Sequence, residues 1–181
     1  MRRVVVIASA SGSGKTTLSR ALAAKLDAPH IELDALVHGP NWTECTADEL
    51  RALVTPRLAE PRWVMDGVYS GKLGTLVLDA ADTVVWLDLS RRVWLPRLLF
   101  RTAKRWITQE PLWNGNRESL RSAILDPDSL LRYAWRMYPY RRETWPTWLA
   151  PYPVIRLRTP EEVDRFLAGV GYAAGRADLS G

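Results

Sequence analysis

Two kinds of hydrophobic pattern alternate along the chain. Short, mainly apolar runs at residues 4–8, 63–65, 83–87 and 154–157 predict strands that are buried on both faces of a sheet. A shorter run at residues 30–34 predicts one more strand, ending in Asp34. Between them lie amphipathic segments such as residues 15–26, where Leu18, Leu22 and Leu26 share one helical face. Strands alternating with helices predict an α/β fold with a parallel sheet and helices on both of its faces.

The remaining helices are marked by capping residues and breakers. They are expected at residues 46–59, 69–78, 90–107, 117–125, 129–138 and 144–149, and from Thr159 onward. Thr46 and Glu49 have the spacing of a capping box, and a bend is expected before Pro56. Ser90 should cap the long basic helix, which Pro96 should kink. The small, polar tail after residue 171 is expected to fray.

A glycine-rich loop joins the first strand to the first helix. Its sequence, Ser9-Ala-Ser-Gly-Ser-Gly-Lys15-Thr16, follows the phosphate-binding pattern G-x-x-x-x-G-K-[ST], with Ser9 at the first glycine position. In this pattern backbone N–H groups surround an anion, the lysine reaches the β- and γ-phosphates and the threonine hydroxyl holds Mg²⁺. The sequence therefore predicts an ATP-binding site, with Mg²⁺, formed by Ser11, Gly12, Ser13, Gly14, Lys15, Thr16 and Thr17.

Length and composition are those of one globular domain. The 181 residues are 47% hydrophobic and 25% charged, and no apolar run approaches the ~18 residues that a membrane span needs. Cys45 is the single cysteine, which excludes an internal disulfide and favours a reducing compartment. We expect a cytoplasmic protein with a single domain over residues 1–181.

Positive charge is concentrated in one segment. Residues 91–142 hold twelve Lys and Arg against four Asp and Glu, a net charge of +8, whereas the whole chain carries +5. Such a segment attracts phosphate, either on a nucleotide or on nucleic acid. Arg97, Arg101 and Arg105 recur every four residues, where like charges repel unless an anion lies between them. A solvated basic helix face is the alternative.

Three carboxylates follow predicted strands. Asp34, Asp66 and Asp88 should therefore lie at the sheet edge that also carries the phosphate loop. Asp66 is a candidate to hold Mg²⁺ together with Thr16, and Asp34 to orient or deprotonate an acceptor hydroxyl. For both, the alternative is a capping or turn residue. Asp88 is expected to be structural, accepting backbone N–H bonds where the helix after Ser90 begins.

Several segments together resemble a known family. The loop motif, Leu33-Asp34, Asn41-Trp42, residues 63–69 (WVMDGVY), residues 81–88 (ADTVVWLD) and residues 114–119 (NGNRES) are similar to small adenylate-kinase-like P-loop proteins known as topology-modulation proteins. The resemblance covers roughly residues 3 to 170. It implies a three-layer P-loop kinase fold, with a five-stranded parallel sheet in the order 2-3-1-4-5 and a helical lid. Nucleoside monophosphate kinases continue their Asp-Gly with aromatic-Pro-Arg, whereas here Val68-Tyr69-Ser70 follows, which argues against AMP as the acceptor.

The resemblance also assigns roles to parts of the chain. It implies an acceptor-side segment at about residues 35–60 and a basic lid at about residues 90–145. Arg97 would lie over the donor base and Arg101 would reach the phosphates, while Arg117 and Arg121 would close from the lid. Trp42 and Tyr69 are candidates for the acceptor wall, with core packing as the alternative. His30 and His38 lack metal spacing and are expected to be structural.

These features predict a Mg²⁺-assisted, ATP-dependent kinase acting on a nucleotide, nucleoside or other small hydroxyl or phosphate acceptor. The catalytic candidates are Lys15, Asp34, Asp66, Arg101 and Arg117. The alternative is a nucleic-acid-binding P-loop NTPase or a topology or transcription regulator, favoured by the basic segment and its interleaved tryptophans. The sequence leaves the acceptor and the oligomeric state open.

Overall fold

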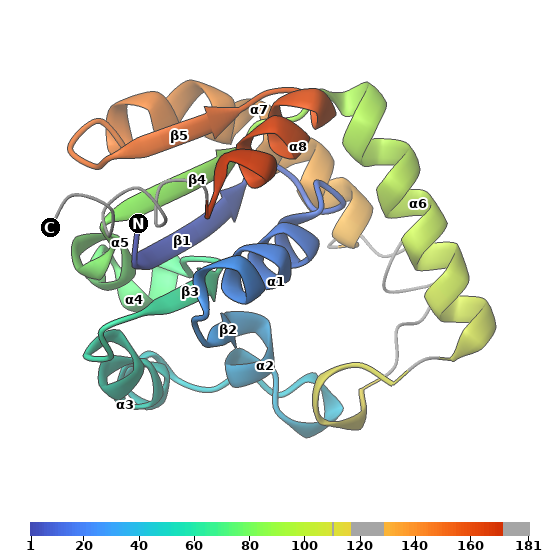
Figure 1. The fold of residues 1–181 in the computed structure, drawn as a ribbon. Coiled ribbons are helices and arrows are strands. Elements are labelled where there is room, and N and C mark those ends of the chain that lie inside the picture. The colour runs from blue at the N-terminus through green and yellow to red at the C-terminus, as the bar shows by residue number, and fades with distance from the viewer. Residues whose placement is uncertain (110, 117–128, 172–181) are drawn as a thin grey trace, which may run out of the picture.

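The computed structural model describes residues 1–109, 111–116 and 129–171. Its centre is a sheet of five parallel strands: β1 (Arg3–Ala8), β2 (His30–Glu32), β3 (Trp63–Asp66), β4 (Thr83–Leu87) and β5 (Val154–Leu157). Their order in the sheet is β2-β3-β1-β4-β5 (Figure 1). The predicted α/β class, parallel sheet and 2-3-1-4-5 order are confirmed.

Helices cover both faces of the sheet and extend beyond one edge. Their bounds are α1 (Lys15–Leu26), α2 (Leu33–Val37), α3 (Ala47–Leu58), α4 (Ser70–Leu73), α5 (Leu76–Ala80), α6 (Arg91–Thr108), α7 (Leu130–Trp148) and α8 (Pro160–Gly169). Two 3₁₀ turns, η1 (Pro40–Trp42) and η2 (Trp113–Gly115), lie in the connections. None of the helices within these described ranges is long and apolar enough to cross a membrane.

Alternation along β1 explains the three layers. Val4 and Val6 point to the face covered by α1 and α8, whereas Val5 and Ile7 point to the face covered by α3, α4, α5 and the end of α7. Successive side chains of a strand point to opposite faces, so a strand buried on both must be apolar at every position. All four of these side chains are fully or almost fully buried. This is the physical basis of the unbroken apolar runs in the sequence.

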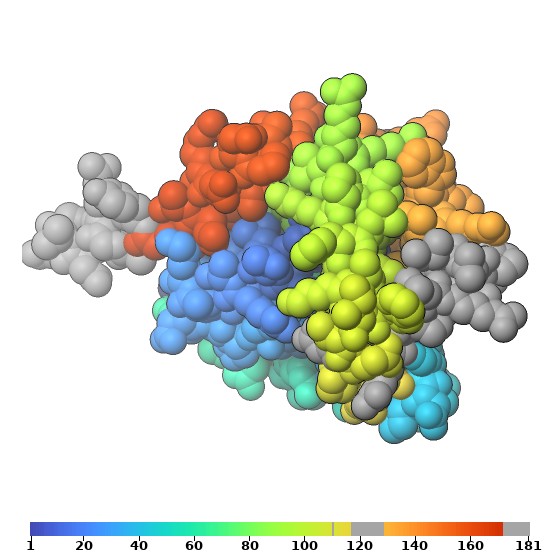
Figure 2. Space-filling model, turned by 90° about the vertical axis from the view of Figure 1, so that its right-hand side faces the viewer, coloured from blue at the N-terminus to red at the C-terminus, as the bar shows by residue number. Residues whose placement is uncertain are grey.

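A third hydrophobic cluster connects the phosphate loop to α6 and α7. Ala10 of the loop packs with Trp94 and Leu98 of α6 and with Ala134 and Tyr138 of α7. The approach is close at Gly12, where a Cβ atom would lie 2.6 Å from the carbonyl oxygen of Trp94. Figure 2 shows α6 crossing this side of the molecule, with the blue N-terminal segment on one side and orange α7 on the other.

The helix caps follow the sequence in most places. Thr46 and Glu49 form the predicted capping box of α3, and Thr159 caps α8 with Pro160 at its first position. Ser90 is the N-cap residue of α6, but its side chain makes no capping hydrogen bond.

Several predicted boundaries were wrong. The second strand ends at Glu32, and Asp34 lies in the first turn of α2 rather than at a strand end. The helix predicted over residues 69–78 is divided into α4 and α5 at Gly74, whose φ of +59° suits glycine but not a continuing helix. The helix predicted at 117–125 lies outside the described residues.

The largest boundary error concerns α7. The predicted helices at 129–138 and 144–149 are one continuous helix that contains Pro139 and Pro146. A proline removes one intrahelical hydrogen bond, but packing can outweigh that loss. Here Trp145, Trp148 and Leu149 pack against the core on the sheet and hold the end of the helix in place.

Candidate active site

The phosphate loop has the backbone geometry of an anion cradle. Gly12 and Gly14 both have φ of +85°, and Gly14 is the N-cap residue of α1. Gly14 has no side chain to cap this helix, and the first N–H groups of a helix have no partner within it, so they can bind an anionic ligand. Ser13 is buried and its hydroxyl donates to the carbonyl oxygen of Ala10 at 2.8 Å, which closes the loop from inside. Ser11 and Thr16 are half-buried and Thr17 is exposed.

Lys15 and Asp66 form an ion pair next to this loop. The carboxylate of Asp66 is fully buried at the end of β3, and its Oδ1 accepts from Lys15 Nζ. Its Oδ2 is also buried and has no hydrogen-bond partner in the described part of the chain. His30 Nε2 lies 4.0 Å from this oxygen, and burial lowers the pKa of His30 below its ordinary value of 6.5.

Gly67 lies between Lys15 and the start of α2, the helix that carries Asp34. It has φ of +106°, and a Cβ atom there would lie 3.4 Å from Lys15 Nζ and 3.9 Å from Leu33 Cβ. Leu33 directly precedes Asp34 in α2. The ends of β2 and β3 therefore meet beside the lysine of the phosphate loop.

Asp34 belongs to a short hydrogen-bonded chain. The Tyr69 hydroxyl donates to Asp34 Oδ1 at 2.5 Å and lies 3.4 Å from His38 Nε2. Tyr69 has a left-handed φ of +42°, which is strained for an aromatic residue. Burial, followed by the negative charge of Asp34, raises the pKa of the Tyr69 hydroxyl far above its ordinary value of 10, so Tyr69 stays a donor toward this carboxylate.

Three aromatic rings border the Asp34 side of the site. His38 makes an edge contact with Trp42 at a centroid distance of 5.4 Å and stacks on Trp113 at 5.8 Å. Asn116, almost fully buried, connects the segments: its Nδ2 donates to the Gly39 carbonyl at 2.9 Å, and its Oδ1 accepts from the Trp42 N–H at 3.0 Å. Residues 111–116 are thus docked on residues 38–43.

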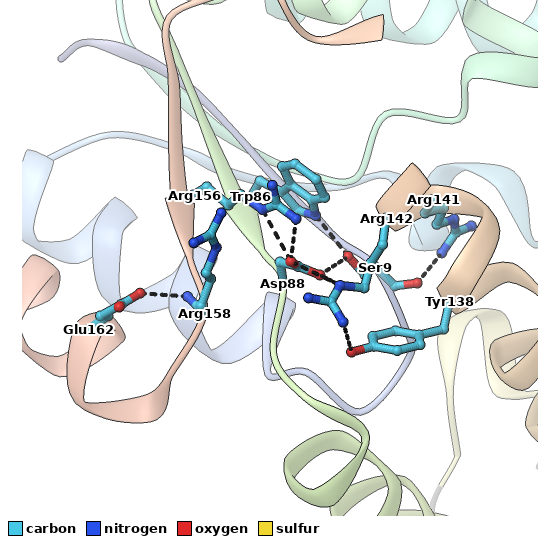
Figure 3. A network of polar contacts seen from close by, with 9 residues as sticks. All are labelled: Ser9, Trp86, Asp88, Tyr138, Arg141, Arg142, Arg156, Arg158 and Glu162. Carbon is cyan, nitrogen blue, oxygen red and sulfur yellow. Dashed lines mark hydrogen bonds and ion pairs between the residues drawn. The ribbon is translucent and has the colours of Figure 1, made fainter. Parts of the chain in front are cut away.

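On the other side of the phosphate loop lies a polar network around Asp88 (Figure 3). The Ser9 hydroxyl donates to Asp88 Oδ1 at 2.9 Å and accepts from Trp86 Nε1 at 2.9 Å. Arg142 and Arg156 form ion pairs with the same carboxylate, at 3.0 and 2.6 Å. The partners of Asp88 are these side chains rather than the predicted N–H groups at the start of α6.

Only some of the arginines predicted to bind the nucleotide or the phosphates lie within the described residues. Arg97 is exposed on α6, whereas Arg101 and Arg105 on the same helix are half-buried. Arg117 and Arg121 lie outside the described residues.

The structure also reveals polar contacts that the sequence did not predict. These involve Asn116, Arg141, Arg142 and Arg156. Asn116 was part of the segment that carried the family resemblance, so a signal for it existed. No local pattern marks the three arginines, because each meets the residues it binds only after the sheet and α7 have assembled.

Comparison with solved structures defines the class of fold. The chain is similar to a gluconokinase from Sinorhizobium meliloti (22% identity, 97% of this chain and 95% of that one, TM-score 0.53). It is similar to a shikimate kinase from Bacteroides thetaiotaomicron (15%, 96% and 98%, 0.55) and to a deoxyadenosine kinase from M. mycoides with bound dCTP (12%, 91% and 96%, 0.51). No family model and no curated protein matches the chain. At these identities the comparison shows the fold, which is that of the P-loop kinases.

Proposed function

We propose that this protein is a Mg²⁺-assisted, ATP-dependent kinase that phosphorylates a hydroxyl or phosphate group of a small molecule. The observation that carries the proposal is the pairing of Lys15 with buried Asp66 beside the glycine loop, with Asp34 in the first turn of α2, directly after the neighbouring strand β2. Phosphoryl transfer needs two positioned substrates and neutralised charge, and these groups provide for both. The P-loop kinase fold of the similar structures supports the proposal.

The donor end is the loop over residues 11–17. Its N–H groups and the first turn of α1 would bind the β- and γ-phosphates of ATP, and Lys15 lies within the same loop and half-buried. Moving the Lys15 ammonium from Asp66 to the phosphates keeps it paired with an anion, and a Mg²⁺ ion arriving with the nucleotide would replace it as the partner of Asp66.

The residues present fit a magnesium ion. Asp66 Oδ2 is a buried acceptor without a hydrogen-bond partner in the described residues, and such a group is costly unless something satisfies it. Thr16 and Asp66 would hold the ion, directly or through water, and phosphate oxygens and water would complete its shell. When bound, Mg²⁺ neutralises charge on the transferring phosphoryl group.

The acceptor end is Asp34. One carboxylate oxygen is engaged by Tyr69, which fixes the orientation of the group and leaves the other oxygen for a substrate hydroxyl. Tyr69, and Trp42 with His38 and Trp113, would border the acceptor. We further propose that Arg97 binds the donor nucleotide and that Arg101 and Arg117 neutralise the phosphates. An adenylate-kinase-like arrangement of this lid, within one domain, is part of the same proposal.

The test is a screen for phosphorylated product. The protein is incubated with Mg·ATP and a panel of nucleosides, nucleotides, sugar acids and other small hydroxyl compounds, and products are identified by mass spectrometry. We expect one acceptor class to gain a phosphoryl group. Asp34→Asn should then lower kcat by about 10²-fold or more without changing ATP affinity, since it removes the base but not the loop.

Asp79→Asn is the matched control. Asp79 is a surface carboxylate that also binds a tyrosine hydroxyl, that of Tyr152 at 2.8 Å, but it lies on α5. Its loss should leave kcat unchanged. Absence of any product, together with no heat of binding for ATP or GTP with Mg²⁺ in calorimetry, would refute the proposed function.

A further inference from the structure

We infer that Ser9 is a positioning residue that couples the phosphate loop to helix α7 through Asp88. The inference rests on the proposed function, because it concerns how the loop is held for nucleotide binding. Its starting point is the departure from the loop pattern: Ser9 stands where the first glycine is usual.

The serine at this position is used for its hydroxyl. Ser9 is fully buried directly after β1, and its Oγ joins Trp86 Nε1 to Asp88 Oδ1, both at 2.9 Å. Its backbone N–H donates to the Leu87 carbonyl at 3.0 Å. The first residue of the loop is therefore fixed to the end of β4 by both its backbone and its side chain. A glycine would keep only the backbone bond.

Asp88 passes this connection on to α7. Its carboxylate is almost fully buried and accepts from three side chains: Ser9, Arg142 of α7 and Arg156 of β5 (Figure 3). The Arg156 guanidinium also lies 4.0 Å from the Trp86 ring centroid. A buried carboxylate is tolerated only while its partners stay in place, so the positions of Ser9 and Arg142 depend on each other.

Arg141 supplies a second connection from the same turn of α7. Its Nη1 lies 3.4 Å from the carbonyl oxygens of both Ala8 and Ser9, and its Nη2 donates to the Tyr133 hydroxyl at 3.0 Å. The guanidinium is packed over the Tyr133 and Trp145 rings. Two consecutive arginines of α7 thus reach Ser9, one at its backbone and the other through Asp88 at its hydroxyl. A shift of α7 must move the start of the phosphate loop or break these bonds.

Removing a member of this network would lower the stability of the protein even if the network had only a structural role. The difference lies in nucleotide affinity: a structural role changes the free energy of unfolding, whereas a positioning role changes the dissociation constant of the folded protein as well. The measurement is the Kd of a non-hydrolysable ATP analogue with Mg²⁺, by calorimetry at a temperature where every variant is folded.

Ser9→Gly is the decisive variant, because it restores the usual loop pattern. We expect it to weaken binding of the analogue about tenfold, and Ser9→Ala to do the same, since small misplacements of binding groups are costly. Unchanged affinity in Ser9→Gly would overturn the inference. Thr83→Val is the control: it removes a hydroxyl that is also buried, at the opposite end of β4, and should leave the Kd unchanged.

A double-mutant cycle tests the connection to α7. Ser9 and Arg142 share Asp88 as a partner. The double variant Ser9→Ala/Arg142→Met should therefore raise the Kd by less than the product of the two fold-changes that the single variants cause. Arg158→Met is the matched control, because exposed Arg158 belongs to the same region but is bound through its backbone to Glu162. Independent effects of Ser9 and Arg142 would refute the coupling. Failure of the unmodified protein to bind the analogue would instead refute the proposed function.

Discussion

At the scale of single residues, Asp66 places a fully buried negative charge in the site. Its carboxylate is fully buried, and the nearest cation is Lys15, whose side chain keeps 24% of its exposure. A buried charge that loses its partner is strongly destabilising, because the cost of desolvation is no longer compensated. The ion pair therefore has a structural effect that is separate from its proposed role in catalysis, and the two can be measured apart.

Lys15→Met should abolish nucleotide binding and lower the free energy of unfolding by about 3 kcal/mol, the low end for a buried pair because the lysine is partly exposed. The double variant Lys15→Met/Asp66→Asn removes the unpaired charge. It should recover most of the stability and none of the binding. Urea denaturation and calorimetry with Mg·ATP check the two expectations. Full binding by the single variant would contradict the role given to Lys15.

His30 makes stability depend on pH. Burial lowers its pKa in the folded state below 6.5, the ordinary value that it has in the unfolded chain. Below about pH 6.5 the unfolded state therefore binds more protons than the folded one. The stability present above pH 6.5 is lost as the pH falls through the lower pKa of the folded state, by at most about 1.4 kcal/mol per pH unit.

His30→Gln removes this titration, although Asp66, Glu32, Lys15 and Arg20 still surround the site. The free energy of unfolding should fall less steeply with acidification in the variant than in the unmodified protein. Urea denaturation at several pH values between 7 and 5 gives both curves, and the other groups cancel in their difference. A constant difference across this range would contradict the prediction.

At the scale of elements, the contact between η1 and η2 determines how one side of the site is closed. Asn116 satisfies two backbone groups of the 38–43 segment, and the Asn114 side chain donates to the His38 carbonyl at 2.6 Å. Both turns include residues with left-handed backbone, Asn41 and Trp42 in one and Asn114 in the other. The two segments stabilise each other's unusual conformations, so they should open together.

Asn116→Ala removes this connection. It leaves the Trp42 N–H and the Gly39 carbonyl without their partner, and hydrogen exchange at residues 39–43 should become faster by about tenfold, corresponding to the loss of roughly one or two hydrogen bonds. Asn41→Gly is the control, since it removes an exposed side chain from the same turn at a φ of +54° that glycine accepts. Equal exchange in the Asn116 variant and the unmodified protein would show that other contacts hold the turn.

The elements also show what a sequence can and cannot reveal. The apolar strands were predicted because burial on both faces leaves an unmistakable pattern in β1 and β4, whereas the order of the sheet was predicted from the resemblance to P-loop kinases. The prolines in α7 led to the wrong prediction of two helices, because local helix propensity does not include the packing of Trp145 and Trp148 on the sheet. Asp34 was placed beyond a strand because one turn of helix is too short to have a period.

At the scale of the whole molecule, part of the positive charge of residues 91–142 is engaged in contacts within the protein. Arg142 pairs with Asp88, Arg141 is turned to the carbonyls of the phosphate loop, and Arg91 lies 4.2 Å from the Trp135 ring centroid. Other described cations of this segment are exposed: Arg92, Arg97, Lys104, Arg132 and Arg136.

The salt dependence of ligand binding distinguishes the kinase proposal from the nucleic-acid alternative. Exposed basic residues such as Arg97 and Arg136 remain on the surface, so weak binding to duplex DNA is expected at low salt. Because such binding comes from counterion release, the logarithm of its association constant should fall linearly with the logarithm of the salt concentration. We expect DNA binding to be undetectable at about 150–200 mM salt. Mg·ATP binding, which depends on the phosphate loop and Lys15, should persist there. Fluorescence anisotropy of labelled duplex and single-stranded DNA across a salt titration checks this. DNA binding that survives at 200 mM salt, or turnover of ATP that requires DNA, would favour the nucleic-acid-binding NTPase.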